Sequence, residues 1–127
     1  VQSNPMNLKY LLLALILLFI GCKKDDNEGI MGKWNLINVS GSIAGVNIDH
    51  PKGEIVWDFG ENLIITNNYT GNFDLSFPTG KYDYELKKDM TLYINGNEFG
   101  TVTSLTDTSM EVGQPKWSDG VFYKFSR

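Results

Sequence analysis

Apolar and polar residues alternate at every second position through most of the chain after residue 30. In residues 54–59, for example, Ile55, Trp57 and Phe59 fall on one side of an extended chain. A period of two places successive side chains on opposite faces of a strand, whereas an amphipathic helix needs a period near 3.6. Because no helical period is visible in this part of the chain, the pattern predicts an all-β domain.

Turn-forming residues divide this alternation into short segments. Asn95-Gly96 is a strong hairpin signal, and Pro78 ends any strand that reaches it. We expect strands over residues 33–39, 54–59, 63–66, 80–87, 91–94, 98–105, 109–112 and 121–126, with a further short strand within 43–48 and an ambiguous segment at 72–79. About eight short antiparallel strands joined by tight turns predict an up-and-down barrel, whose interior holds side chains or one small ligand.

An apolar run precedes this domain. Tyr10 to Ile20 are apolar, Lys9 lies before them, and Gly21 and the only cysteine, Cys22, follow. A basic start, a short apolar run and a small residue form a secretory signal, and the run is shorter than the ~20 residues that span a bilayer. We expect a signal helix over 1–21, a polar tether over 22–29 and a barrel over 30–127. An uncleaved signal anchor or a buried helix is the alternative.

The segment Phe19-Ile20-Gly21-Cys22 resembles the lipobox of bacterial lipoproteins, with Phe where Leu is usual. The resemblance implies cleavage before Cys22 and attachment of diacylglycerol and an acyl chain such as palmitate to that residue. Several chains give stable membrane anchoring. The acidic residues Asp25, Asp26 and Glu28 resemble a surface-export signal, although a plain solvated spacer has the same composition. We expect a lipid anchor in the bacterial outer membrane; the export-signal resemblance implies a domain at the cell surface, whereas a plain spacer leaves either face of that membrane open.

Gly32-Lys33-Trp34 at the start of the first strand resembles the G-x-W motif of lipocalins, and Arg127 closes the last strand. In lipocalins an arginine packs across this tryptophan, so the resemblance implies a barrel-closing contact between Trp34 and Arg127. It also implies a lipocalin-like barrel that binds a small apolar ligand. The residues that would line the ligand site are Trp57, Phe59, Tyr82, Tyr84 and Leu92. A packed core needs the same inward positions, and the chain is much shorter than a full-length lipocalin.

Several kinds of chemistry find no support in the sequence. The formal net charge is −4 without a basic stripe, which argues against nucleic-acid binding. His50 is the only histidine and Cys22 the only cysteine, so neither a metal cluster nor a disulfide is expected. Asp58, Asp83 and Glu85 alternate with aromatic residues and read as outward surface charges rather than a catalytic pair. We expect no enzyme and no cofactor.

Two hypotheses for function follow. The first is a monomeric, non-catalytic binding lipoprotein with a small apolar ligand in its barrel. The second is a protein-interaction or protease-inhibitor-like surface protein that uses its loops, with residues 113–120, including Pro115 and Trp117, and residues 70–80 as contacts. An interior void favours the first hypothesis, whereas a packed interior favours the second. An enzyme would have to depend on His50.

Overall fold

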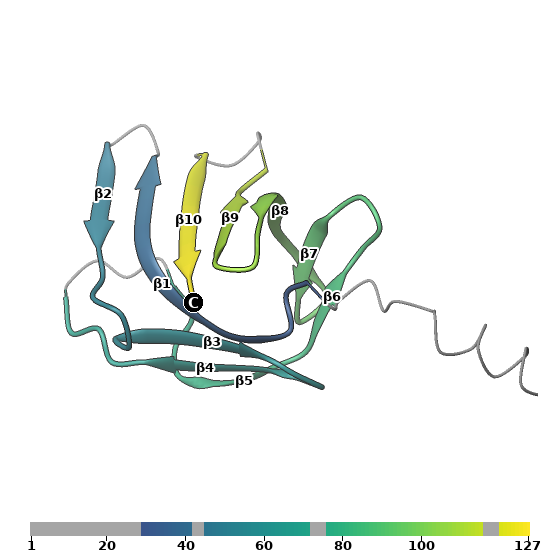
Figure 1. Ribbon diagram of the computed structural model, residues 1–127, viewed down its shortest axis with the longest axis horizontal. Coiled ribbons are helices and arrows are strands. Elements are labelled where there is room, and N and C mark those ends of the chain that lie inside the picture. Colours follow the sequence, from purple (N-terminus) through teal and green to yellow (C-terminus); the bar gives the residue numbers. More distant parts are fainter. Residues whose placement is uncertain (1–28, 42–44, 72–75, 116–119) are drawn as a thin grey trace, which may run out of the picture.

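The computed structural model describes residues 29–41, 45–71, 76–115 and 120–127, which form a nearly closed antiparallel barrel (Figure 1). The expected all-β barrel is confirmed. Ten strands make up its sheet: β1 (Gly32–Gly41), β2 (Val46–Asp49), β3 (Ile55–Phe59), β4 (Leu63–Asn67), β5 (Gly80–Tyr82), β6 (Tyr84–Leu86), β7 (Thr91–Ile94), β8 (Asn97–Leu105), β9 (Ser109–Gly113) and β10 (Val121–Ser126). Among the described residues, no helix is long and apolar enough to cross a membrane. The expected signal helix and nearly all of the tether lie outside the described residues.

The ten strands are the expected eight plus the expected short strand within 43–48, which is β2, and one more because the expected strand over 80–87 is interrupted. β2 and β3 both pair with β1, β2 along Asn38 to Gly41 and β3 along Gly32 to Asn35. β5 and β6 follow each other directly, separated by Asp83, and pair with β4 and β7 respectively. The sheet runs β5-β4-β3-β1-β10-β9-β8-β7-β6. The chain itself therefore joins the two ends of the sheet at Asp83.

A bulge in β1 lets the sheet bend over itself. The register between β1 and β10 shifts between Leu36 and Asn38, and such a bulge bends a strand and increases its twist. The amide of His50, between β2 and β3, donates to the carbonyl of Ile37 at 2.9 Å. Figure 1 shows the result: β3, β4 and β5 run across the direction of β2 and β10.

The core lies where the inner faces of these strands meet. Trp34 and Leu36 of β1, Trp57 of β3 and Leu63 and Ile65 of β4 are fully buried, and their neighbours along each strand point outward. Burial of a large apolar side chain contributes about 1.5–3 kcal/mol before cavity effects. The alternation in the sequence therefore reports which side of each strand faces this core.

Position 100 in β8 requires a glycine, because β8 and β9 approach each other closely there. A Cβ atom built on this residue would lie 2.5 Å from the carbonyl oxygen of Gly113 and 3.0 Å from the Val112 side chain. Overpacking of this kind typically costs about 1–3 kcal/mol. We expect Gly100→Ala to lower the free energy of unfolding in urea by that amount. Gly60→Ala is the matched control, because its Cβ would meet nothing nearer than 3.8 Å; equal stability of the two variants would contradict this reading.

Candidate binding surfaces

Aromatic rings fill the interior of the barrel. The ring of Trp57 lies 5.1 Å from that of Phe125, 5.5 Å from Phe99 and 5.8 Å from Phe77, measured between centroids. The network continues from Phe59 to Tyr84, from Phe77 to Tyr82 and from Phe99 to Tyr123. Separations of 4.5–7 Å with tilted or edge-to-face rings are the favourable geometry for aromatic packing.

The residues expected to line a ligand site belong to this packed interior. Trp57, Phe59 and Leu92 are at most 1% exposed. Tyr82 and Tyr84 are half-buried, and their hydroxyls donate to the carbonyls of Pro78 and Gly60, each at 2.6 Å. The structure thus brings all five residues to one core, where they contact other side chains. Their role toward a ligand stays a prediction.

The indole nitrogen of Trp57 is an exception within this core. It is buried, and none of the described residues gives it a hydrogen-bond partner. A buried donor without a partner costs roughly 1–3 kcal/mol. A hydrogen-bond acceptor supplied from outside the chain would satisfy this nitrogen.

The base of the barrel is the end at which β1 begins and β10 ends. The Arg127 guanidinium lies 4.0 Å from the centroid of the Trp34 ring, and the indole nitrogen of Trp34 donates to the carbonyl of Ile30 at 2.9 Å. Arg127 also donates to the carbonyls of Gly29 and Met31, at 3.3 and 2.6 Å. One tryptophan and one arginine therefore hold both ends of the described chain together.

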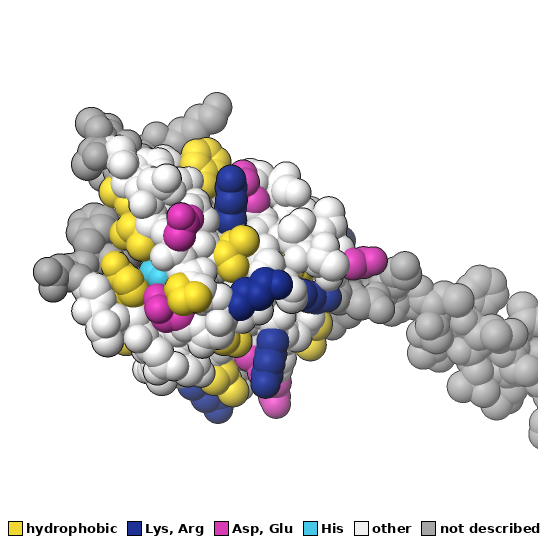
Figure 2. All heavy atoms as spheres, turned by 60° about the vertical axis from the view of Figure 1, so that its left-hand side comes forward, with side chains coloured by type: hydrophobic (Ala, Val, Ile, Leu, Met, Phe, Trp, Pro, Cys, Tyr) yellow, Lys and Arg dark blue, Asp and Glu magenta, His cyan; other side chains and the backbone are white. Residues whose placement is uncertain are grey.

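His50 is built into the connection between β2 and β3. Its Nδ1 lies 2.9 Å from a carboxylate oxygen of Glu54, and its ring stands edge-on to Tyr69 at 4.7 Å. The ring is almost completely buried, and in Figure 2 little more than its rim shows among hydrophobic and acidic side chains. These contacts give His50 a structural role in fixing this connection.

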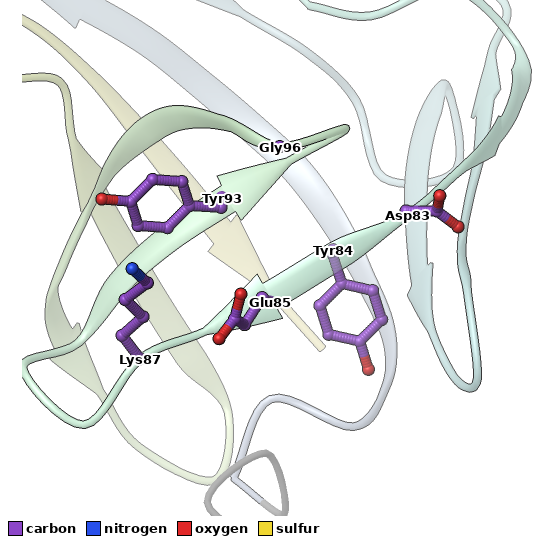
Figure 3. A pocket seen from close by; sticks show the side chains of 6 residues that line it. All are labelled: Asp83, Tyr84, Glu85, Lys87, Tyr93 and Gly96. Carbon is purple, nitrogen blue, oxygen red and sulfur yellow. The ribbon is translucent and has the colours of Figure 1, made fainter.

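A polar hollow of about 320 Å³ lies on the outer side of β6 and β7 (Figure 3). Glu85 and Tyr93 face each other across the two strands, and the Lys87 ammonium lies 4.4 Å from the centroid of the Tyr93 ring. We call this the β6–β7 hollow; it is lined by Asp83, Tyr84, Glu85, Lys87, Tyr93 and Gly96.

Backbone contacts fix one wall of the β6–β7 hollow. The Asp83 amide donates to the side-chain oxygen of Asn95 and the Asn95 amide donates to the Asp83 carbonyl, both at 2.9 Å. Asn95 and Gly96 have positive φ, as the predicted Asn-Gly hairpin requires. Of the three carboxylates expected to be outward charges, Asp83 and Glu85 are exposed and Asp58 of β3 is half-buried.

Two further hollows adjoin each other on the outer side of β1, β3, β4 and β5. Their volumes are about 370 and 300 Å³, and both are lined by Asp58 and Ile64. Lys33 lines the first and Lys81 the second. Ile64 is 52% exposed, and single exposed apolar side chains of this kind are common on protein surfaces.

The loops expected to contact a partner are described only in part. Residues 72–75 and 116–119, including Trp117, lie outside the described residues. Phe77 lies between residues 72–75 and β5. It was not predicted as a core residue, yet its ring packs on that of Trp57. The alternation of Phe73, Leu75 and Phe77 with polar residues was the available signal, but Pro78 concealed where Phe77 would point.

The described residues contain no group of three or more His, Cys, Asp or Glu side chains that could hold a metal ion. The chain was compared with protein-family models, with curated proteins and with solved structures, and none of these comparisons found a match. The fold itself defines the class of protein: a small antiparallel β-barrel with an aromatic interior.

Proposed function

We propose that this chain is a non-catalytic binding lipoprotein of the bacterial outer membrane, anchored by an acylated Cys22. Its barrel binds a partner protein through its outer surface and loops. The observation that supports this choice is the packed interior, in which Trp57 contacts other rings on several sides. Ligand sites for small molecules are usually preformed concave pockets of about 300–1,000 Å³ that enclose most of the ligand.

The outer surface offers polar groups suited to a protein partner. Asp83 and Glu85 are exposed beside the half-buried Tyr93 in the β6–β7 hollow. The hydrogen bonds between Asp83 and Asn95 hold this region in place before any partner arrives. Tyrosine is enriched among the residues that dominate binding at protein interfaces, and a backbone that is already held in place lowers the cost of binding.

A small ligand inside the barrel is the second candidate function. The indole nitrogen of Trp57, for which the described part of the chain offers no acceptor, favours it, because an amphipathic ligand with one acceptor oxygen would satisfy this donor. Such a ligand would have to displace ring contacts such as the one between Trp57 and Phe77. The first candidate requires no such rearrangement.

Lipid attachment to Cys22 is the most direct test of the proposed anchor. In a bacterial host grown with an alkyne analogue of palmitate, the full chain should incorporate the label and fractionate with membranes. Cys22→Ser should abolish labelling completely, because no other cysteine exists. A chain that is exported but never labelled would contradict the proposal. The total amount of the Cys22→Ser protein, measured by immunoblot, controls for expression.

A further inference from the structure

We propose that Asn95 is a site of spontaneous covalent modification, at which the side-chain amide is lost and the residue becomes aspartate or isoaspartate. The change loosens the junction at Asp83, where the chain joins the two ends of the sheet; we call this junction the seam. The inference is independent of the proposed anchor and partner, because the reaction needs only the chain itself and water.

Gly96 leaves its backbone nitrogen unshielded. Of all the asparagines in the chain, only Asn95 is followed by glycine. Both residues are exposed, and a Cβ atom built on Gly96 would meet nothing within 4 Å apart from its neighbours in the chain. Any other residue at this position would place a side chain beside the nitrogen. The atom that must attack the Asn95 side chain is therefore accessible.

The hairpin also leaves the Gly96 amide out of the ladder between β7 and β8. Asn95 and Gly96 form the loop, and the pair Ile94 and Asn97 closes it. Among the described residues, no acceptor takes a hydrogen bond from the Gly96 amide. A nitrogen held in a ladder bond would have to break that bond before it could react, and the Gly96 nitrogen does not carry this cost.

A backbone donor already points at the oxygen on which negative charge develops. When the Gly96 nitrogen attacks Cγ of Asn95, the side-chain oxygen Oδ1 becomes an oxyanion. The Asp83 amide donates to this oxygen at 2.9 Å. Preorganised donors at roughly 2.7–3.1 Å stabilise such intermediates, and in enzymes one donor is worth about 10²–10³-fold in rate. The folded seam therefore favours the reaction at Asn95.

The reaction balances with water as its only co-reactant. The bond between the Gly96 nitrogen and Cγ of Asn95 forms, the bond between Cγ and Nδ2 breaks, and the proton of the Gly96 amide leaves with Nδ2 as ammonia. Water then opens the resulting succinimide at either carbonyl carbon. Opening at Cγ gives aspartate, whereas opening at the backbone carbonyl carbon gives isoaspartate, whose main chain runs through Cβ and Cγ.

Either product changes the seam. Asp83 and Asn95 exchange two hydrogen bonds, both of 2.9 Å. Aspartate keeps an acceptor for the Asp83 amide but adds a carboxylate close to the exposed Asp83 and Glu85. Isoaspartate adds a main-chain carbon to the loop, so the pairing of Ile94 with Asn97 and both bonds to Asp83 cannot all be kept.

Peptide mapping by mass spectrometry tests the site. The purified chain from Cys22 is warmed at neutral pH, folded in one sample and unfolded by guanidinium in the other. Asn97 is the internal control, because it is also exposed but is followed by Glu98. Asn95 should lose its amide at least about tenfold faster than Asn97, and its rate in the folded chain should lie within about tenfold of that in the unfolded chain. Slower loss in the folded chain would overturn the proposal, because the turn would then protect Asn95.

The variant Asn95→Gly supplies the second arm. Glycine at both loop positions suits this turn, so the hairpin is kept while the reacting amide is removed. The variant should yield no acidic form of this peptide and no substrate for isoaspartate methyltransferase. In the aged wild-type chain, the isoaspartate fraction should exchange the Asp83 amide hydrogen about threefold to tenfold faster than the fresh chain, as expected for the loss of one hydrogen bond. Unchanged exchange at Asp83 would refute the loosening of the seam.

Discussion

Trp57→Ala should lower the free energy of unfolding by about 3–5 kcal/mol, the usual cost of removing a large buried aromatic side chain. Trp57 is completely buried, and its ring contacts those of Phe77, Phe99 and Phe125. The variant loses these ring contacts and leaves a cavity that strands on several sides would have to close. Urea unfolding followed by far-ultraviolet circular dichroism gives the value without relying on tryptophan emission.

Trp57→Phe is the informative companion of that variant. Phenylalanine keeps most of the ring and removes an indole nitrogen that has no partner among the described residues. Removing the unpaired N–H group abolishes its desolvation cost of about 1–3 kcal/mol. This gain offsets the packing free energy that is lost with the smaller ring, so the free energy of unfolding should change by less than about 1 kcal/mol. A loss above roughly 2 kcal/mol would mean that the nitrogen is bonded to a buried water or ligand.

Trp34→Ala should cost a similar 3–5 kcal/mol, for different reasons. Trp34 is completely buried at the base, below the Arg127 guanidinium, and donates to the Ile30 carbonyl. Its removal takes away packing, a cation–π contact of about 0.5–2 kcal/mol and a buried hydrogen bond. The same urea measurement should show the chain destabilised and the ends of β1 and β10 exchanging amide hydrogens faster.

Trp34→Phe separates the polar contacts of Trp34 from its packing. The indole donor of Trp34 is satisfied, whereas that of Trp57 has no acceptor within the described ranges, so the same substitution should cost at least 1 kcal/mol more at position 34. Arg127→Gln serves as control, because it removes the cation and keeps the tryptophan. Equal costs of Trp34→Phe and Trp57→Phe would contradict the hydrogen-bond assignment at the base.

Most strands could be predicted because each has one buried and one exposed face. Residues 55–59 and 121–126 alternate in the sequence and are strands with alternating burial in the structure. The break at Asp83 could not be predicted in this way, since the alternation passes through it without interruption. It arises because the chain changes partners there, from β4 to β7, and a change of partner is a property of the closed barrel.

The candidate surfaces depended on contacts that a single sequence does not contain. Glu85 and Tyr93 share a hollow through strand register, and Lys33 and Lys81 line two adjoining hollows only because strand pairing brings β1 and β5 to the same side of the sheet. The contact between Trp34 and Arg127 spans nearly the whole domain and was expected only through the lipocalin resemblance. Cys22, by contrast, could be interpreted locally, because its signal consists of adjacent residues.

The central claim is that the barrel has a filled interior and binds through its outside. Titration of the wild-type mature chain with a fluorescent fatty acid tests this most directly, since such a probe brightens when it enters an apolar cavity. The packed rings around Trp57 predict no saturable increase in probe emission and no change in tryptophan emission. A saturable one-to-one response that Trp57→Ala abolishes would contradict the claim and assign the ligand to the barrel interior.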